Sequence, residues 1–148
     1  MKHALTESEA VWIAAVIDCE GTLTVHTAWN KARHNRSLQF FGRVEMVGAE
    51  VPSRLQTLCG GSRWRSRSRQ PNGRPRTVWN ITSNGLRWLL PQLLPYLIVK
   101  HRHAEILLEL LAGNPQGRHG CAYKTPFNRL QELMAELRTL NYIQGISA

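Results

Sequence analysis

The chain has 148 residues, enough for one hydrophobic core but not for two, so a single domain over residues 1–148 is expected. Lys and Arg number 19 against 10 Asp and Glu, a formal net charge of +9, and most of the cations are Arg. Arg suits phosphates and guanine edges, so we expect a polyanionic partner and no small-molecule substrate. No signal-peptide pattern opens the chain and no apolar run approaches the roughly 20 residues that cross a bilayer, so we expect an intracellular, soluble protein without membrane contact.

The first predicted helix runs over residues 7–18 and starts at a capping box formed by Thr6 and Glu9. Its second half is apolar on all sides, so one face must meet this protein's own core and another must meet something else. The adjacent small residues Ala14 and Ala15 would let a second helix approach closely. A helix-on-helix contact, with another copy as one possible partner, is therefore favoured.

Period-two alternation after this helix predicts a β-hairpin with strands over residues 22–30 and 38–47, joined by the polar segment NKARHNR. The side chains expected on its solvent faces, and assigned to DNA, are Thr24, His26, Gln39 and Arg43. A helix over residues 50–58 follows and ends at two glycines.

A second hairpin is predicted in SRWRSRSRQPNGRPRTVWNITSNG, with its turn at Asn72-Gly73. Alternate positions on its first strand carry Arg63, Arg65, Arg67 and Arg69, and its return strand places Arg76, Asn80 and Thr82 on one side. Four like charges along one side of a strand repel one another and make a poor structural choice, so the four arginines are assigned to DNA contact. Arg76, Asn80 and Thr82 of the return strand are assigned to DNA with them. We expect Arg65 and Arg67 to recognise bases and Arg69 to contact phosphate.

Leucines at helical spacing predict further helices over residues 86–94, 95–111 and 126–140. The order is then αββαββα followed by further helix, an α+β fold with one antiparallel sheet and its helices on one face. The other face would be left to the cationic side chains.

The segment IAAVIDCEG, residues 13–21, resembles the signature of the LAGLIDADG homing endonucleases. Ala14, Ile17, Asp18 and Gly21 match outright, the other five positions are conservative, and Glu20 replaces the final Asp. LPYLIVKHRHAEILLELL and LQELMAELRTLN are similar to later segments of that family, and the element order is also the family's. Only one copy of the motif is present, which in this family implies a homodimer.

The resemblance implies a Mg²⁺-dependent endonuclease that cuts both strands of a long, pseudo-palindromic double-stranded DNA target under a saddle-like antiparallel sheet. The carboxylate of Glu20 and the backbone carbonyl of Cys19 would hold the metal, for which Ca²⁺ or Mn²⁺ could substitute in binding, and Lys100 would act near the scissile phosphates. The residues expected at the dimer interface are Trp12, Ala14, Ala15 and Asp18, the last also as a cap at the helix junction. His101 and His103, which flank Lys100 in the sequence, are expected at the surface or against the backbone.

One departure leaves other readings open. Family members commonly carry a Gln at the end of the second strand, but here the stretch is RVEMVGAE, in which Arg43 or Glu45 would have to substitute. A relative without the chemistry, acting as an RNA maturase or a DNA-binding regulator, is the second hypothesis. A module whose basic sheet binds acidic proteins is the third.

Overall fold

The computed structural model describes residues 2–30, 35–67, 71–113 and 125–147, so Arg69 and most of the loop before the last helix lie outside the described residues. The helices are α1 (Glu7–Glu20), α2 (Glu50–Cys59), α3 (Ser83–Leu93), α4 (His101–Ala112) and α5 (Phe127–Ser147). The strands are β1 (Gly21–Asn30), β2 (Asn35–Met46), β3 (Ser62–Ser66) and β4 (Arg76–Thr82). The order αββαββα followed by two helices confirms the predicted α+β fold class.

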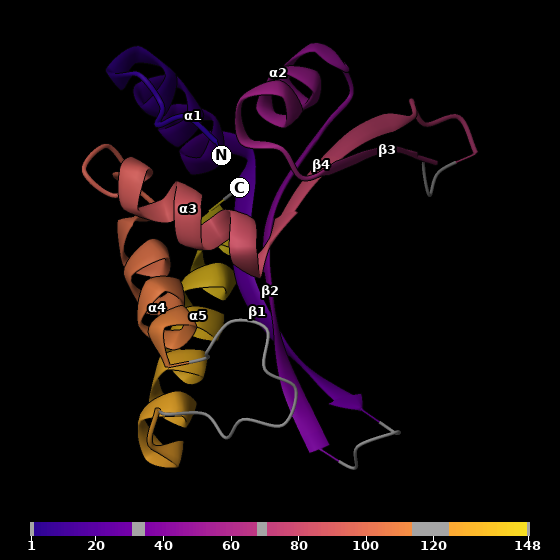
Figure 1. The fold of residues 1–148 in the computed structure, drawn as a ribbon. Coiled ribbons are helices and arrows are strands. Elements are labelled where there is room, and N and C mark those ends of the chain that lie inside the picture. The colour runs from indigo at the N-terminus through magenta and orange to yellow at the C-terminus, as the bar shows by residue number, and fades with distance from the viewer. Residues whose placement is uncertain (1, 31–34, 68–70, 114–124, 148) are drawn as a thin grey trace.

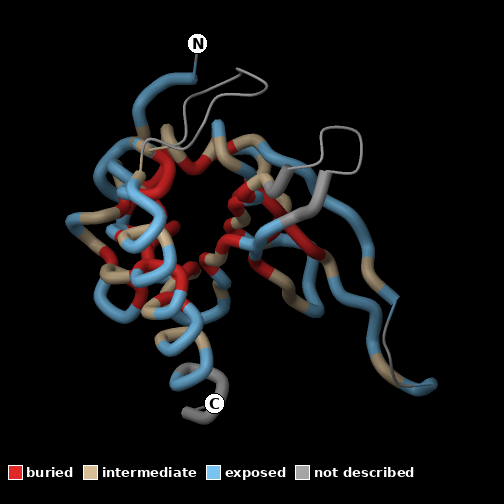
Figure 2. Tube along the Cα trace, turned by 90° about the horizontal axis from the view of Figure 1, so that it is seen from below, coloured by how far each residue is buried: buried red, intermediate tan, exposed pale blue. Residues whose placement is uncertain are grey.

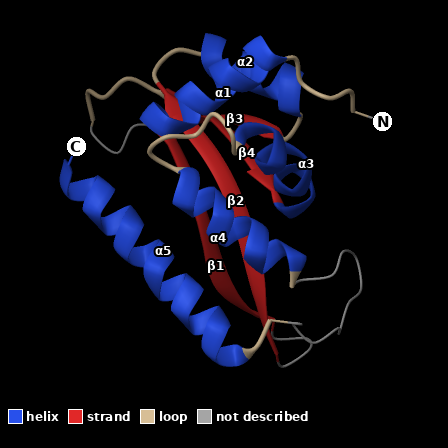
Figure 3. Ribbon diagram, turned by 90° about the vertical axis from the view of Figure 1, so that its left-hand side faces the viewer, coloured by secondary structure: helices blue, strands red, loops and turns tan. Residues whose placement is uncertain are grey.

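The strands form one antiparallel sheet in the order β1-β2-β4-β3. Its helices lie on one side, with α2 over the β3–β4 ribbon and α4 and α5 alongside β1 and β2 (Figures 1 and 3). The β3–β4 ribbon bends away from the long β1–β2 ribbon, so the uncovered face of the sheet is curved (Figure 1). We call this uncovered side the outer face.

The core fills the layer between the sheet and the helices. Figure 2 shows the buried segments gathered there, and they include Leu23, Val44 and Trp79 of the sheet. Ile13 and Ile17 of α1 face the same layer. Strand alternation that buries one side in this way leaves the next residue of each strand on the outer face.

Two glycines direct the chain from α2 into β3. Gly60 and Gly61 have φ values of 73° and 86°, a region that side chains with a Cβ rarely adopt. A Cβ on Gly61 would lie 2.4 Å from the carbonyl oxygen of Asn80. The indole of Trp79 donates a 2.8 Å hydrogen bond to the Gly60 carbonyl, which fixes this turn against β4.

The helix expected over residues 95–111 begins at His101 instead, so that prediction was wrong about its start. The amides of Ile98 and Lys100 donate to the carboxylate of Asp18 rather than to carbonyls four residues earlier, so the chain forms a turn there. Among the described residues, no helix combines the length and apolar character that a membrane span requires.

Candidate nucleic-acid interface and catalytic junction

The signature segment ends where α1 passes directly into β1 with no connecting loop. Glu20 is the last residue of the helix, and Gly21 opens the strand while donating its amide to the Ile17 carbonyl. A Cβ at position 21 would lie 2.7 Å from the backbone of Ile17, so this direct passage requires glycine. The exposed Glu20 side chain has no hydrogen bond or ion pair with any described residue.

Asp18 joins this junction to the start of α4. Its two carboxylate oxygens accept hydrogen bonds from the amides of Ile98 and Lys100, at 2.8 and 2.9 Å. The Lys100 side chain is only 6% exposed, and burial lowers the pKa of its amine although the nearby Asp18 carboxylate opposes that shift. The structure therefore brings Lys100 to the same end of α1 that carries Glu20.

His103 lies one turn further along α4 and is buried, so its expected surface position was wrong. Burial first, and the charge of Lys100 second, lower the pKa of its imidazole. Neither ring nitrogen has a hydrogen bond of good geometry, although the amide of Asn141 lies beside the ring. His101, by contrast, contacts the backbone as predicted, with Nδ1 2.9 Å from the Leu94 carbonyl.

The outer face carries most of the side chains predicted to contact DNA. Strand register places His26 opposite Gln39, and Arg43 opposite Asn80. Together with the alternation of buried and exposed residues, it assigns to this face Thr24, His26, Gln39, Arg43, Arg76, Asn80 and Thr82.

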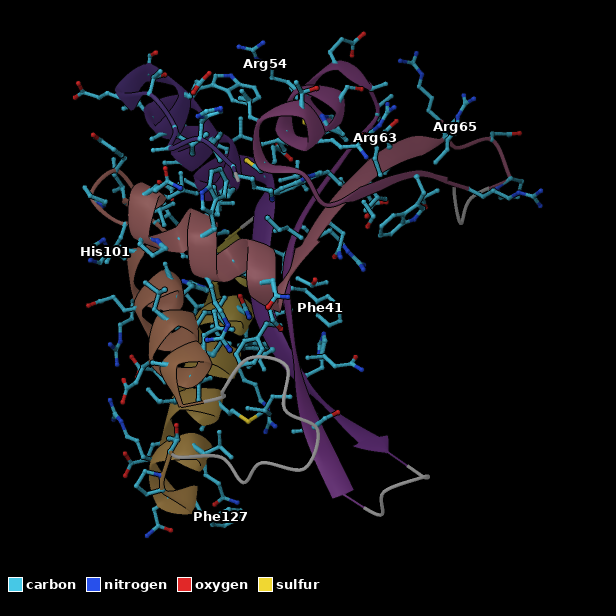
Figure 4. All side chains as sticks on the ribbon, in the orientation of Figure 1. Phe41, Arg54, Arg63, Arg65, His101 and Phe127 are labelled. Atoms are coloured by element: carbon cyan, nitrogen blue, oxygen red, sulfur yellow. The ribbon has the colours of Figure 1, made fainter. Side chains whose placement is uncertain are left out.

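Arg63 and Arg65 lie on the opposite, helix-bearing side, so their predicted place on the DNA face is corrected. They pair in register with Trp79 and Thr77, and Figure 4 shows both on the side of the β3–β4 ribbon that bears α2. Arg63 donates to Gln56 at 3.1 Å and to the Ser53 hydroxyl at 2.7 Å. The turn at the two glycines sets which side of β3 faces outward, and the alternation of arginines cannot reveal it.

The outward side of β3 is formed by Ser62, Trp64 and Ser66. Arg67 follows the end of this strand and lines a hollow of about 680 Å³ on the outer face. The charged and aromatic side chains around this hollow are Arg43, Glu45, Trp64, Arg67, Arg74 and Arg76. Four cations against one acid make it strongly electropositive.

Two ring contacts on the outer face were not foreseen. The guanidinium carbon of Arg43 lies 5.5 Å from the centroid of the Trp64 ring. The rings of His26 and Phe41 lie 5.6 Å apart, and Figure 4 shows Phe41 on the side of β2 away from the helices. Trp64 lies between Arg63 and Arg65, so the alternation that puts the arginines on one side of β3 puts Trp64 on the other. The sequence therefore did indicate that an aromatic ring and the arginines face opposite sides.

The predicted dimer residues separate into two groups. Ala14 is fully buried against the core of its own chain, so its assignment to the dimer interface is corrected. Trp12 is half-buried and borders a small hollow with Arg54 of α2. The free side of α1 is a stripe of exposed residues, Val11, Ala15 and Cys19, which we call the α1 stripe.

No family model matches the chain, and no curated protein matches its sequence. Solved structures do match it. The archaeal intron-encoded homing endonuclease I-Vdi141I, complexed with DNA, aligns with a TM-score of 0.71 and 22% identity over 90% of this chain and 84% of that one. The homing endonuclease I-CvuI, in complex with a DNA target in the presence of Mg, gives 0.70 and 19% over 90% and 82%.

The LAGLIDADG homing endonuclease I-GzeII, in complex with its DNA target, aligns with a TM-score of 0.60 and 12% identity. The alignment covers 88% of this chain but only 43% of that one. The chain therefore has the fold of the LAGLIDADG homing endonucleases, as the signature segment and the element order predicted.

Proposed function

We propose that the protein is a homodimeric, Mg²⁺-dependent endonuclease that makes a double-strand break in a long, pseudo-palindromic DNA target. The observation that carries this proposal is the exposed Glu20 carboxylate, which has no partner among the described residues, at the point where α1 enters the first strand of the cationic outer face. A carboxylate at a helix C-terminus is poorly matched to the helix dipole, so a nearby cation would stabilise it. The solved neighbours crystallised with DNA support a nucleic-acid substrate.

The donors at the junction fit a magnesium ion. Mg²⁺ is usually bound by one or two carboxylates together with waters and substrate phosphates. Glu20 supplies the carboxylate, and the Cys19 carbonyl belongs to the last turn of α1, whose carbonyls lack partners within the helix. The described residues include no cluster of three or more His, Cys, Asp or Glu that could hold a metal, so its other ligands would come from water and DNA. Bound there, the ion would activate water and stabilise charge on the phosphate.

Lys100 would contribute a second positive charge beside the reacting phosphate. The Lys100 backbone amide is held by Asp18, which lies two residues before Glu20 in α1. The Lys100 side chain therefore starts from a fixed point close to the proposed metal ligand. A preorganised cation in a partly buried site stabilises developing negative charge more strongly than one in water. Asp18 therefore acts as a positioning residue for Lys100.

A second copy would complete the site. The α1 stripe exposes small side chains, and small side chains permit close helix packing. Twofold packing of two α1 helices would place two Glu20 carboxylates near the axis, one for each DNA strand. This chain aligns with less than half of I-GzeII, so that protein is long enough to contain a second unit of similar size. Two copies of this chain would supply the same number of units, which supports the proposed dimer.

Glu20→Gln tests the chemistry. The substitution keeps the size of the side chain and removes its charge, so cleavage of a selected target should fall below detection while duplex binding stays within about threefold of wild type. Glu7→Gln, the same change at the opposite end of α1, is the matched control and should cleave normally. A Glu20→Gln protein that still cuts the target would overturn the assignment.

A DNA-binding protein without cleavage is the second candidate, and one observation favours it. Met46 ends β2 on the side of Thr77, away from the outer face, and the preceding outward residue is the acid Glu45 rather than an amide. Calorimetric titration of Mg²⁺ or Ca²⁺ into the DNA complex separates the two: an inactive protein should show no binding that depends on Glu20.

A further inference from the structure

Trp64 is a large apolar side chain on the open face of an edge strand. Its exposed fraction is 42%, and it sits at the centre of the five-residue strand β3. Exposed apolar surface of this size on a sheet edge favours unwanted strand pairing. Neither the fold nor the proposed chemistry requires an aromatic ring at this position.

The ring has a defined neighbour. Register places Trp64 opposite Val78 of β4 and Arg43 of β2 opposite Asn80, so the two side chains lie diagonally across β4 on the outer face. The 5.5 Å between the Arg43 guanidinium carbon and the ring centroid is a cation–π contact. The ring therefore restricts where the guanidinium points.

The N–H groups of Arg43 donate no hydrogen bond within the part of the chain that the structure describes. Arg43 forms no ion pair or hydrogen bond with any described residue, although Glu45 projects from the same side of the same strand. A cation–π contact uses the positive charge of the guanidinium and consumes none of its N–H groups, so these can still donate to a ligand. The edge of an exposed guanidinium matches the two acceptors of guanine in the major groove.

We propose that Arg43 recognises a guanine in each half-site and that Trp64 is the positioning residue that holds its guanidinium for this contact. The assignment rests on the proposed function, because it needs duplex DNA on the outer face. It also argues against base stacking on Trp64 as the main role of that ring, since Arg43 already covers one of its faces.

The assignment places base recognition on the outer face, with Arg43 and Trp64, and not on the side of β3 that carries Arg65. Arg65, expected from the sequence to recognise a base, lies on the helix-bearing side and is the natural control. It is an exposed cation on the same short strand as Trp64, so it tests charge and strand stability without touching the Arg43 contact.

The experiment is selection of bound sites from a randomised duplex library, followed by affinity measurements on the selected site and its single-base variants. Wild-type protein should prefer guanine at one position of each half-site. Arg43→Ala and Trp64→Ala should each reduce that preference about tenfold, the size expected for one bidentate guanine contact, and leave other positions unchanged. Trp64→Phe retains a ring and should restore most of the preference, whereas Arg65→Ala should leave it intact.

The outcomes are distinguishable. Unchanged base preference in both Arg43→Ala and Trp64→Ala, or loss of the same preference in Arg65→Ala, would overturn the assignment while leaving the proposed function standing. If Trp64→Ala weakened binding to every duplex equally and Trp64→Phe did not restore it, Trp64 would be a purely structural residue. That result would also overturn the assignment. A wild-type protein that binds no duplex would overturn the proposed function, and this assignment with it.

Discussion

Individual buried polar groups cluster at the end of α1. Lys100, just before α4, and His103, on α4, are both buried, and each has its charged form disfavoured by burial. Asp18 is the acid that faces them, and it binds backbone amides rather than a cationic side chain. Ionising a buried imidazole that has no well-formed hydrogen bond to a described residue is costly, so protonation of His103 should lower the free energy of unfolding.

His103 should make stability fall in mild acid. Because its pKa is lowered in the folded state from the ordinary 6.5, the unfolded chain binds more protons between the two values. The free energy of unfolding should therefore be fully maintained above pH 6.5 and decrease below it, by at most about 1.4 kcal/mol per pH unit for this group. Urea unfolding at about pH 7.5, 6.5 and 5.5 measures this decrease. The free energy of unfolding of His103→Gln should depend less on pH than that of the wild-type protein.

The neighbouring half-exposed histidine provides the comparison, since His101→Gln changes the same chemistry two positions away. Its pH dependence of stability should follow that of the wild-type protein. If His103→Gln retained the full wild-type decrease below pH 6.5, burial of this imidazole would not be the cause of the acid sensitivity.

At the scale of elements, one side chain of α1 sets the start of α4. The Asp18 hydrogen bonds to Ile98 and Lys100 span about 80 positions of sequence and replace the helical bonds that these two amides would otherwise form. The two sides of the β3–β4 ribbon have different surroundings, since one side faces α2 and the other is the open outer face. Arg63 is held by α2, whereas Arg76 borders the open hollow.

Asp18→Ala should loosen the turn before α4. Loss of two charge-assisted hydrogen bonds at a cap should lower the free energy of unfolding by about 1–3 kcal/mol. Asp18→Asn keeps one acceptor oxygen and should lose about half as much. Denaturant unfolding measures both, and an Asp18→Ala protein within about 0.5 kcal/mol of wild type would show that the turn does not depend on this carboxylate.

The two sides of the ribbon should respond differently to removal of a cation. Arg76→Ala, on the outer face, should weaken binding to all duplexes alike and reduce the log–log salt slope by about one. Arg63→Ala, on the helix side, should leave affinity within about twofold because its guanidinium is held by Ser53 and Gln56. Equal effects of the two variants on the salt slope would mean that DNA reaches both sides of the sheet.

For the whole molecule, the proposed dimer joins two chains of formal charge +9 along one DNA. The α1 stripe is where the copies would meet, because it is the side of that helix that its own core leaves uncovered. Ile98, 85% exposed in the turn held by Asp18, lies close to that seam.

Ala15→Glu should separate the dimer into folded monomers, because twofold packing would bring two added carboxylates together at the helix contact. Light scattering after size exclusion should give half the wild-type mass, and double-strand cleavage should be lost. Ala135→Glu, at an exposed alanine of α5, is the matched control and should remain dimeric and active. A wild-type protein that is monomeric both alone and on DNA would contradict the dimer.

Local sequence patterns determined much of this protein. The capping box of Thr6 and Glu9 forms as predicted, with both reciprocal hydrogen bonds, and the period-two segments are the strands. The two glycines after α2 adopt the left-handed region that only glycine occupies readily. Each of these features depends on residues within a few positions of one another, so the sequence contains what fixes them.

What only the tertiary structure decided depends on contacts between distant segments. Alternation shows that Arg63 and Arg65 share one side of β3, but pairing with β4 decides that this side faces α2 and that Trp64 faces outward. Ala14 and Ala15 are likewise equally small and adjacent in the sequence, yet packing against the core decides that Ala14 is buried and Ala15 is exposed. A periodic pattern fixes which residues lie together, whereas the side that meets the core is set by the partner it buries against.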